Sequence, residues 1–196
     1  MGGPVCLDFV NTLDDRYSGE PKELLKSYLD LACFAEDTGI LDNLQVDRLF
    51  TRSQQSPEAA EHALRTAIEM REAMYGVFWA VVTRKAVPEA ALQVLNGFVQ
   101  TAAQHVSLVP ASGHFEWRFE SRLIEFESPL WPIARSAGEL LASHQLAYVR
   151  ACASKTCEWL FLDESKNHAR RWCDMTKCGN RAKVKRFYAK NKEASN

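Results

Sequence analysis

The sequence lacks the features that identify membrane proteins, secreted proteins and several enzyme classes. No apolar run approaches the ~18–20 residues that a transmembrane helix needs, and the first residues form no basic segment followed by an apolar one. There is no Gly-rich phosphate loop, no Gly-x-Ser-x-Gly turn and no His-Glu-x-x-His run, and the 5 histidines have no ligand spacing. We therefore expect a cytoplasmic protein that is not an enzyme and has no membrane partner.

A net charge is also nearly absent, but only because two oppositely charged parts cancel. The 196 residues carry a formal net charge of -1. Residues 150–196 hold 12 of the 24 Lys and Arg but only 5 of the 25 Asp and Glu, a net of +7, which leaves residues 1–149 at -8. This asymmetry predicts two domains with separate tasks, an acidic body (residues 1–149) and a basic module (residues 150–196). We expect the body to fold without the module.

Hydrophobic periodicity predicts that the body is mainly helical. Apolar side chains recur at helical spacing in most of it, with Ser56 and Pro57 as a helix start and Asp42 as a cap. The expected helices are residues 22–37, 42–50, 57–84, 88–105 and 129–149, the last broken near His144, and residues 5–14 are a short helix or an extended segment.

A short β segment interrupts this pattern. At residues 115–120 the period changes to two, so that Phe115, Trp117 and Phe119 share one face. Residues 106–109 come before them, and the sequence Pro-Ala-Ser-Gly at 110–113 is typical of a turn. The sequence predicts a small β-hairpin or meander, with residues 123–126 as a possible third strand.

Four of the six cysteines form a cluster in the basic module. They are Cys152, Cys157, Cys173 and Cys178, with the pattern Cys-x4-Cys-x15-Cys-x4-Cys. Two close pairs of thiolates can surround one Zn²⁺ tetrahedrally, and four sulfur ligands leave no position for a catalytic water. The alternative is four buried or disulfide-bonded cysteines, for which this segment has little apolar core. We predict one structural Zn²⁺, and we expect Cys6 and Cys33 to be core residues of the body.

A basic helix is predicted to begin at the last cysteine. Val184, Phe187 and Tyr188 share one helical face, which we expect to pack on the zinc core. The residues predicted to contact nucleic acid are Arg170, Arg171, Arg181, Lys183, Lys185, Arg186 and Lys190. A solvated basic face and charge balance for the thiolates are the alternatives, but twelve basic residues exceed what either needs. For Arg181, a structural role beside Cys178 competes with contact to a base.

The motifs around the cysteines resemble the CGNR zinc finger. They are Cys152-x4-Cys157, Trp159-Leu160-Phe161-x-Asp163-x-Ser165, Arg170-Arg171-Trp172-Cys173-x-Met175 and Cys178-Gly179-Asn180-Arg181-x-Lys183. Upstream, Leu7-Asp8-Phe9-Val10-Asn11-Thr12 and Leu130-Trp131-Pro132-Ile133-Ala134 resemble the ABATE domain that usually precedes this finger. The resemblance implies a bacterial stress-induced transcription regulator whose zinc finger binds DNA, with the four cysteines as zinc ligands. One departure is Lys166-Asn167-His168, where the family often has Arg-Asn.

The remaining polar and aromatic residues of the body allow two interpretations each. Asp8, Asn11 and Thr12 either line a pocket or cap the first helix and tie it to the body, and we favour capping. Three tryptophans either line a cavity or, as we expect, fill the core: Trp79, Trp117 and Trp131.

The fold class that follows is mainly α with a small β-hairpin or meander, completed by a four-cysteine finger of short strands and a basic helix. The function we expect is a transcription regulator that binds DNA through this finger, as a homodimer, with a body that dimerises or senses a small-molecule effector. The first alternative is a zinc-stapled protein-interaction or scaffold protein without DNA binding. An enzyme with an unrecognised pocket is a weaker one.

Overall fold

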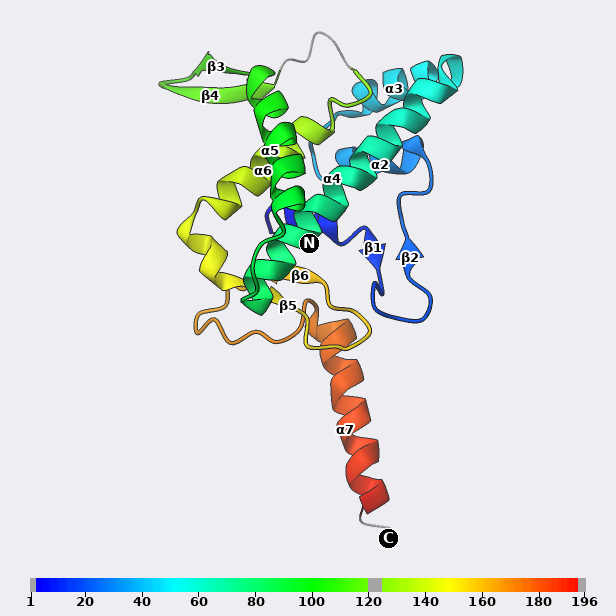
Figure 1. The fold of residues 1–196 in the computed structure, drawn as a ribbon, viewed down its shortest axis with the longest axis vertical. Helices are drawn as coiled ribbons and strands as arrows, with labels where there is room; N and C mark the ends of the chain where they lie inside the picture. The colour runs from blue at the N-terminus through cyan, green and yellow to red at the C-terminus, as the bar shows by residue number, and fades with distance from the viewer. Residues whose placement is uncertain (1–2, 120–124, 194–196) are drawn as a thin grey trace.

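A computed structural model describes residues 3–119 and 125–193, without the side chains of Arg186 and residues 189–193. It has a helical body, a short β-sheet beneath it and a long helix that projects from the far end (Figure 1). The helices of the body are α1 (Val5–Val10), α2 (Tyr28–Asp37), α3 (Asn43–Gln55), α4 (Pro57–Thr83), α5 (Glu89–Gln104) and α6 (Leu130–Leu141). The predicted mainly α architecture is confirmed. No helix of the described residues is both long enough and apolar enough to cross a bilayer.

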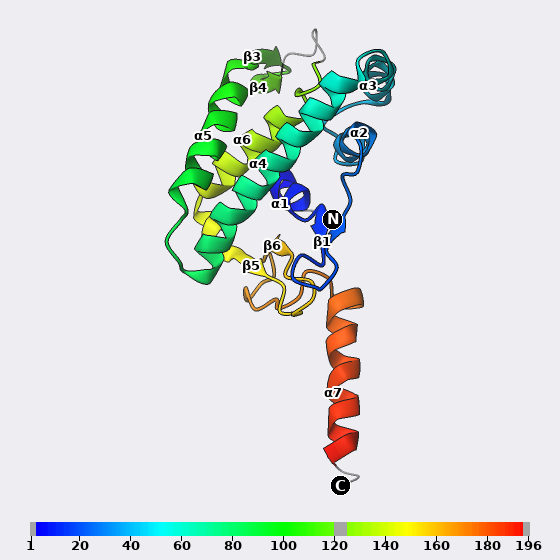
Figure 2. The same ribbon diagram turned by 45° about the vertical axis from the view of Figure 1, so that its right-hand side comes forward.

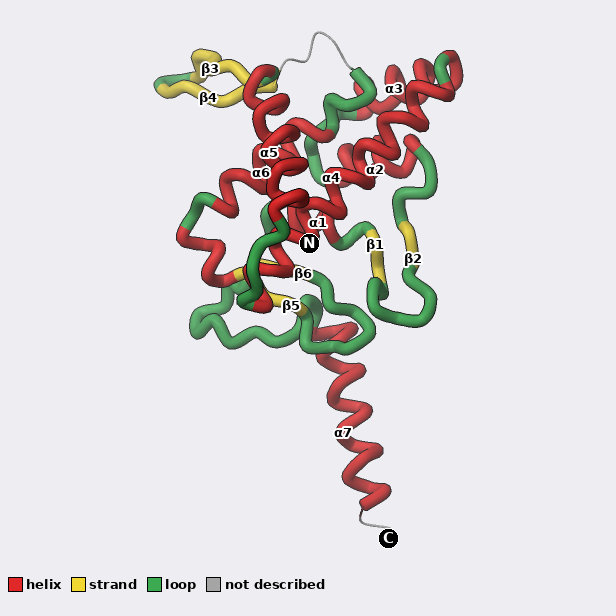
Figure 3. Tube along the Cα trace, viewed as in Figure 1, coloured by secondary structure: helices red, strands yellow, loops and turns green. Residues whose placement is uncertain are grey.

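In the described residues the strands form three separate antiparallel pairs (Figure 3). They are β1 (Leu13–Asp14) with β2 (Lys22–Glu23), β3 (Val106–Ala111) with β4 (His114–Phe119), and β5 (Val149–Ala151) with β6 (Leu160–Leu162). The pair β3–β4 is the predicted hairpin, which is confirmed. Of the possible third strand, residues 123 and 124 lie outside the described residues, while Glu125 and Phe126 lie in a loop and a turn.

Helix α4 is the centre of the body, and α1, α2, α3, α5 and α6 pack around it (Figures 1 and 2). Its buried face combines small side chains, such as Ala63 and Ala67, with larger ones, such as Met70. The small side chains allow neighbouring helices to approach closely. It begins at Pro57, as predicted, although the Ser56 side chain makes no capping hydrogen bond. It ends where Arg84 adopts a left-handed conformation with φ 56°.

Two capping boxes set the starts of the shorter helices. Ser27 and Asp30 cap each other's backbone at the start of α2, and Asp42 and Gln45 do the same for α3. The Asp42 cap is confirmed, and α3 runs five residues beyond the predicted end. The predicted helix over residues 22–37 is wrong in its first part, because the Ser27–Asp30 box starts the helix later and Lys22–Glu23 pairs with β1.

A buried arginine joins the second strand to the central helix. Arg71 of α4 is 2% exposed, and its Nη1 and Nη2 donate to the Glu23 carboxylate at 2.6 and 2.7 Å. Its Nε donates to Glu72 at 2.9 Å and its Nη1 to the Thr12 hydroxyl at 3.3 Å. Because a buried guanidinium is unfavourable without such partners, this network fixes the loop between β1 and β2 on the body.

The body connects to the cysteine-rich module without a linker. After α6, a 3-10 turn η1 (His144–Tyr148) leads directly into β5, so the predicted helix over residues 129–149 breaks near His144, as expected. Val149 of β5 and Leu160 and Leu162 of β6 are buried in the same apolar core as α1 and α4. The domain division after residue 149 therefore falls inside β5, and independent folding of the body stays a prediction.

The last elements of the described residues are the π-helical turn η2 (Met175–Gly179) and, directly after it, α7 (Asn180–Glu193). Helix α7 points away from the body along the long axis of the molecule (Figures 1 and 2). The prediction that its apolar face packs on the zinc core is wrong, since Phe187 and Tyr188 are 62% and 68% exposed. Helical periodicity places these side chains on one face, but within residues 3–119 and 125–193 no element packs closely enough to bury that face.

Candidate metal centre and nucleic-acid interface

The four clustered cysteines meet at one point between β5–β6 and α7. Cys152 follows β5, Cys157 ends a tight turn, Cys173 lies in the following long loop and Cys178 lies in η2. Their Sγ atoms all lie within 4.8 Å of one another. The Sγ atoms of Cys157 and Cys173 are 3.5 Å apart, and those of Cys173 and Cys178 are 3.8 Å apart.

This spacing fits a tetrahedral metal site. With metal–sulfur bonds of ~2.3 Å, the edges of the tetrahedron are about 3.8 Å. The thiols influence one another: hydrogen bonding with Cys157 and Cys173 lowers the pKa of Cys152, and the same contacts with Cys152 raise the pKa of Cys157 and Cys173. The donor set and its geometry thus match a divalent ion that takes four thiolates.

Of the other two cysteines, only one is a core residue. Cys6 is fully buried in α1, as predicted, and burial raises the pKa of its thiol to about 12. Cys33 is exposed, so the expectation of a core position is wrong. The buried face of α2 is formed by Tyr28, Leu31, Ala32 and Ala35, and Cys33 lies outside it.

Short-range hydrogen bonds hold the metal-binding loops. The amide of Cys152 donates to the carbonyl of Trp159 at 2.8 Å, and the amide of Cys157 donates back to Ser154 at 3.0 Å to close the first turn. At the second pair, the Asp174 carboxylate accepts from the amides of Thr176 and Lys177 at 2.7 and 3.2 Å. Each cysteine pair is therefore shaped by its own local turn.

Each residue of the Cys178-Gly179-Asn180-Arg181 run has a distinct structural role. Cys178 supplies one sulfur, and a Cβ on Gly179 would lie 3.1 Å from the Met175 Sδ, closer than ordinary contact. The Asn180 side chain donates to the carbonyl of Thr176 at 3.0 Å, which secures the turn to α7. Arg181 lines a hollow of ≈ 540 Å³ beside the cysteines.

That hollow brings acidic and basic residues together. Asp14 and Asp15 from the body and Asp174 line it together with Lys177 and Arg181. The base of the module thus has acidic neighbours, whereas α7 extends beyond them (Figure 2).

A buried aspartate organises the loop between β6 and Cys173, a role that the sequence analysis missed. The Asp163 carboxylate accepts from the amide and hydroxyl of Ser165 at 3.0 and 2.6 Å and from the amide of Arg170 at 2.9 Å. The His168 Nδ1 lies 2.7 Å from the Asp163 carbonyl. The Asp-x-Ser spacing was the available signal, since it is typical of a side chain that closes its own turn.

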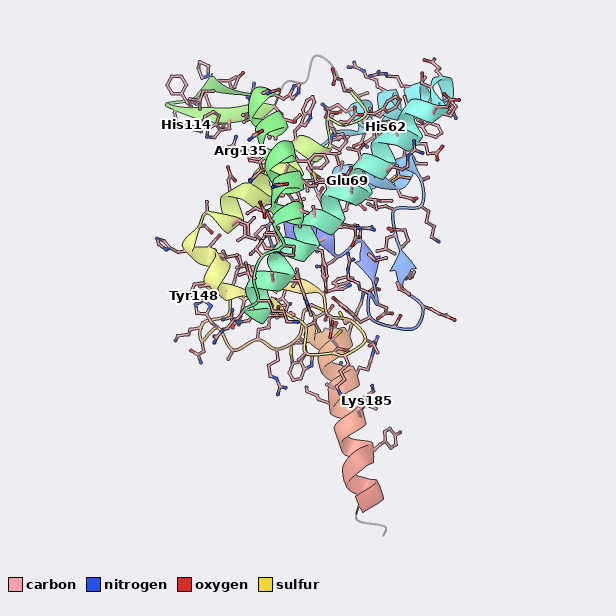
Figure 4. All side chains as sticks on the ribbon, in the orientation of Figure 1. His62, Glu69, His114, Arg135, Tyr148 and Lys185 are labelled. Atoms are coloured by element: carbon pink, nitrogen blue, oxygen red, sulfur yellow. The ribbon has the colours of Figure 1, made fainter. Side chains whose placement is uncertain are left out.

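The predicted nucleic-acid residues divide into two groups. Arg170 is committed to the fold, because its Nε donates to the Trp172 carbonyl at 2.8 Å, its Nη2 donates to the Cys173 carbonyl, and its guanidinium lies over the Phe161 ring at 4.8 Å. Arg170 is nevertheless exposed to solvent, and so are the four residues of the second group, Arg171, Arg181, Lys183 and Lys185 (Figure 4 labels Lys185). The side chains of Arg186 and Lys190 lie outside the described residues.

An asparagine of the body holds the module in place. The Asn11 side chain lies against β6, where its Nδ2 donates to the Leu160 carbonyl at 2.8 Å and its Oδ1 accepts from the Leu160 amide at 2.9 Å. The Trp159 indole donates to the Asp14 carboxylate at 2.7 Å. This contact could not be predicted from the sequence, because Asn11 and Leu160 are 149 positions apart in the chain.

The other two polar residues of that segment behave differently. The Thr12 hydroxyl donates to the Phe9 carbonyl at 2.7 Å and so caps the end of α1, as favoured. Asp8 lines a hollow of ≈ 190 Å³ between α1 and the module, and burial raises the pKa of its carboxyl. The capping interpretation is therefore correct for Thr12, and the pocket interpretation is correct for Asp8.

The Asn11 contact makes a testable prediction about stability. Asn11→Ala should lower the free energy of unfolding by about 1–3 kcal/mol, because it leaves both backbone groups of buried Leu160 without these partners. Urea unfolding of the metal-loaded protein measures the change, with Asn96→Ala, an exposed position on α5, as the control. An equal loss in the two variants would contradict the proposed link.

Two family models match the chain. The model of the ABATE family, described as "Putative stress-induced transcription regulator", matches residues 3–144. A model of the CGNR zinc finger matches residues 148–191, which contain all four clustered cysteines. No curated protein matches the chain. Both descriptions fit a regulator that binds a metal ion and neither names an enzyme.

Proposed function

Since the chain belongs to the ABATE family and ends in a CGNR zinc finger, we propose that it regulates transcription by binding DNA through the finger and α7. The observation that carries this proposal is the position of α7, a helix with exposed basic side chains that starts at a cysteine cluster and projects free of the acidic body (Figures 1 and 2). Such a helix can reach the phosphates of a duplex, while the negative body keeps the rest of the molecule away.

We propose Zn²⁺ as the ion, held by Cys152, Cys157, Cys173 and Cys178. Four thiolates in a tetrahedron are the typical donor set of structural zinc, and the ion would keep all four ionised and join the two turns into one unit. Its task is architectural. It fixes the direction in which α7 leaves the module.

The exposed basic side chains would make the contacts with DNA. Lys183 and Lys185 lie along α7, and helical periodicity puts Arg186 and Lys190 on the same side as Lys183. Arg171 lies within the finger, two residues before Cys173, with its guanidinium 5.3 Å from the Trp172 ring centroid. Arg170 supports the loop instead, and Arg181 lies beside Asp14 and Asp15, which favours a structural role for both.

A second candidate function is supported by the exposed apolar residues of α7. Val184, Phe187 and Tyr188 are 53%, 62% and 68% exposed, which suits a helix that docks into a groove of another protein. In that case the metal would only hold the C-terminal module together, and the basic residues would contact an acidic partner.

A salt series distinguishes the two functions. Binding of the metal-loaded chain to random-sequence duplex should weaken steeply with salt, and Lys183/Arg186/Lys190→Ala should lower the slope of log K against log salt by about one unit per lost phosphate contact. The matched control is Lys26/Arg48/Lys85→Ala, which removes three exposed charges from the body. Equal affinity and slope in all three proteins would refute DNA binding by α7 and favour protein docking.

The body completes the proposal. Its acidic helices would dimerise or bind a small-molecule effector, so that one dimer presents two fingers to DNA in the cytoplasm. A shallow groove of ≈ 300 Å³ between α2 and α4, lined by Tyr28, Leu29, Pro57 and Leu64, is one place for such an effector. No catalytic role is assigned to the body.

A further inference from the structure

The hairpin β3–β4 carries an apolar face that the fold leaves open. Leu108 and Trp117 are cross-strand neighbours on this face, as are Pro110 and Phe115. Leu108, Trp117 and Phe115 are 54%, 58% and 68% exposed. Arg135 of α6 lies over the Trp117 ring at 4.8 Å, and Phe119 packs against the core, so the base of the hairpin is anchored while its outer part projects (Figures 1 and 4).

The two edges of this hairpin differ in their ability to pair. Proline has no N–H, so Pro110 and Phe115 form a non-hydrogen-bonded pair of the ladder. Hydrogen-bonded and non-hydrogen-bonded pairs alternate in an antiparallel ladder, so the pairs two residues away are also non-hydrogen-bonded. The amides of Phe115, Trp117 and Phe119 therefore point away from β3. By the same alternation, Pro110 is one of the β3 residues whose backbone faces the outer edge of β3. Because it has no N–H to donate, it blocks the pairing of a further strand at that edge.

The outer edge of β4 is thus the one edge of the hairpin with donors as well as acceptors in regular order. Within the described part of the chain, no further strand pairs with it. Long, apolar, unprotected edges are the surfaces on which strands of a second molecule add.

We propose that two copies of this chain pair through this edge, β4 against β4 in antiparallel orientation, about a twofold axis at Trp117. This register sets Trp117 opposite Trp117 of the second copy and Phe115 opposite Phe119. It also sets Glu116 opposite Arg118, twice, on the polar face. Aromatic pairs and opposite charges are the cross-strand combinations that stabilise a sheet, so the strand is complementary to itself.

On the pairing strand itself, the acidic residue Glu116 has basic neighbours. It lies 3.1 Å from the His114 Nε2 and 3.7 Å from an Arg118 nitrogen. Hairpin and α7 lie at opposite ends of the long axis, so the interface leaves α7 uncovered (Figure 1). The proposal deepens the dimer part of the proposed function and rests on that part alone, since it makes no assumption about DNA.

Sedimentation equilibrium of the full, metal-loaded chain tests this interface. The wild type should approach twice its mass of 22.2 kDa with rising concentration. Glu116→Arg and Arg118→Glu should each raise the dissociation constant at least about tenfold, because each places like charges opposite one another. The double variant Glu116→Arg/Arg118→Glu restores opposite charges and should dimerise within about threefold of the wild type.

Leu108→Lys provides the matched control. It places a charge on the same apolar face but on strand β3, which does not take part in the proposed pairing. A dimer formed by β4 edge pairing should therefore survive, whereas a dimer formed by stacking two apolar faces should dissociate. Four results would overturn the proposal: a wild type that stays monomeric, single charge variants that dimerise normally, a double variant that remains dissociated, or a Leu108→Lys variant that dissociates as strongly as they do. None of these results bears on the α7 salt series, so dimerisation and DNA binding can fail separately.

Discussion

Cys173→Ser should reduce the bound metal from about one ion per chain to almost none and should unfold the C-terminal module. Cys173 lies 3.5 Å from the Cys157 sulfur and 3.8 Å from the Cys178 sulfur, so its loss opens the cluster at its centre. In small zinc fingers metal binding contributes about 10–16 kcal/mol, most of the folding free energy, and a serine hydroxyl does not replace a thiolate. Elemental analysis and circular dichroism measure the two effects.

The control for this variant is Cys33→Ser. Cys33 is exposed on α2, far from the cluster in the fold, so the metal content should not change. Full metal occupancy in Cys173→Ser would exclude the four-cysteine centre. The body helices should survive the loss, because α1 and α4 keep most of their own buried contacts.

Glu23→Ala should destabilise the protein by about 1–3 kcal/mol, because it removes two hydrogen-bond acceptors from buried Arg71 while Glu72 and Thr12 still accept from it. Arg71 is buried, and Glu23 accepts two of its hydrogen bonds while also accepting from the Leu25 amide at 2.9 Å. Chemical unfolding measures the change. Glu69→Ala, at an exposed position on the same α4 (labelled in Figure 4), should change stability by no more than about 0.5 kcal/mol. Similar losses in both variants would contradict the role of the Arg71 network.

The same pair predicts how stability depends on pH. Burial by itself raises the pKa of Glu23, but the hydrogen bonds and charge of Arg71 outweigh it and hold this pKa below its ordinary value of 4.5. A carboxyl whose pKa is lower in the folded state stabilises the fold above the unfolded-state pKa, and this contribution disappears as the pH falls through the folded-state value. Unfolding of the wild type should therefore become easier below about pH 4.5, and Glu23→Gln should flatten this part of the profile.

The four-cysteine cluster was predictable because its signal is local. The four cysteines follow a spacing that two short turns can close, and thiolate chemistry restricts what such a set can do. The hairpin was predictable for a similar reason, since alternation and turn residues act between neighbours in the chain. By contrast, the start of α2 was wrong because the pairing of Lys22–Glu23 with Leu13–Asp14 competes with helical periodicity.

Contacts between distant segments could not be read from the sequence. Asn11 resembles a helix cap, yet it hydrogen-bonds to Leu160, and the choice between these partners depends on where β6 lies in the complete fold. Trp117 was expected in the core because tryptophan usually is buried, but its strand projects from the body. Trp131 is buried and Trp79 half-buried, stacked 5.5 Å from Tyr75. For α7, helical periodicity identified the apolar face correctly. Periodicity does not indicate whether another part of the fold covers that face.

Selection of bound sequences from a random pool of DNA duplexes tests the central proposal most directly. The metal-loaded wild type should retain duplex and enrich a common sequence over successive rounds, since base contacts specify and phosphate contacts hold. Retention should fall sharply for Lys183/Arg186/Lys190→Ala and after removal of the metal by a chelator. Equal recovery of DNA by the wild type, the triple variant and the chelated protein would contradict a finger that presents α7 to DNA.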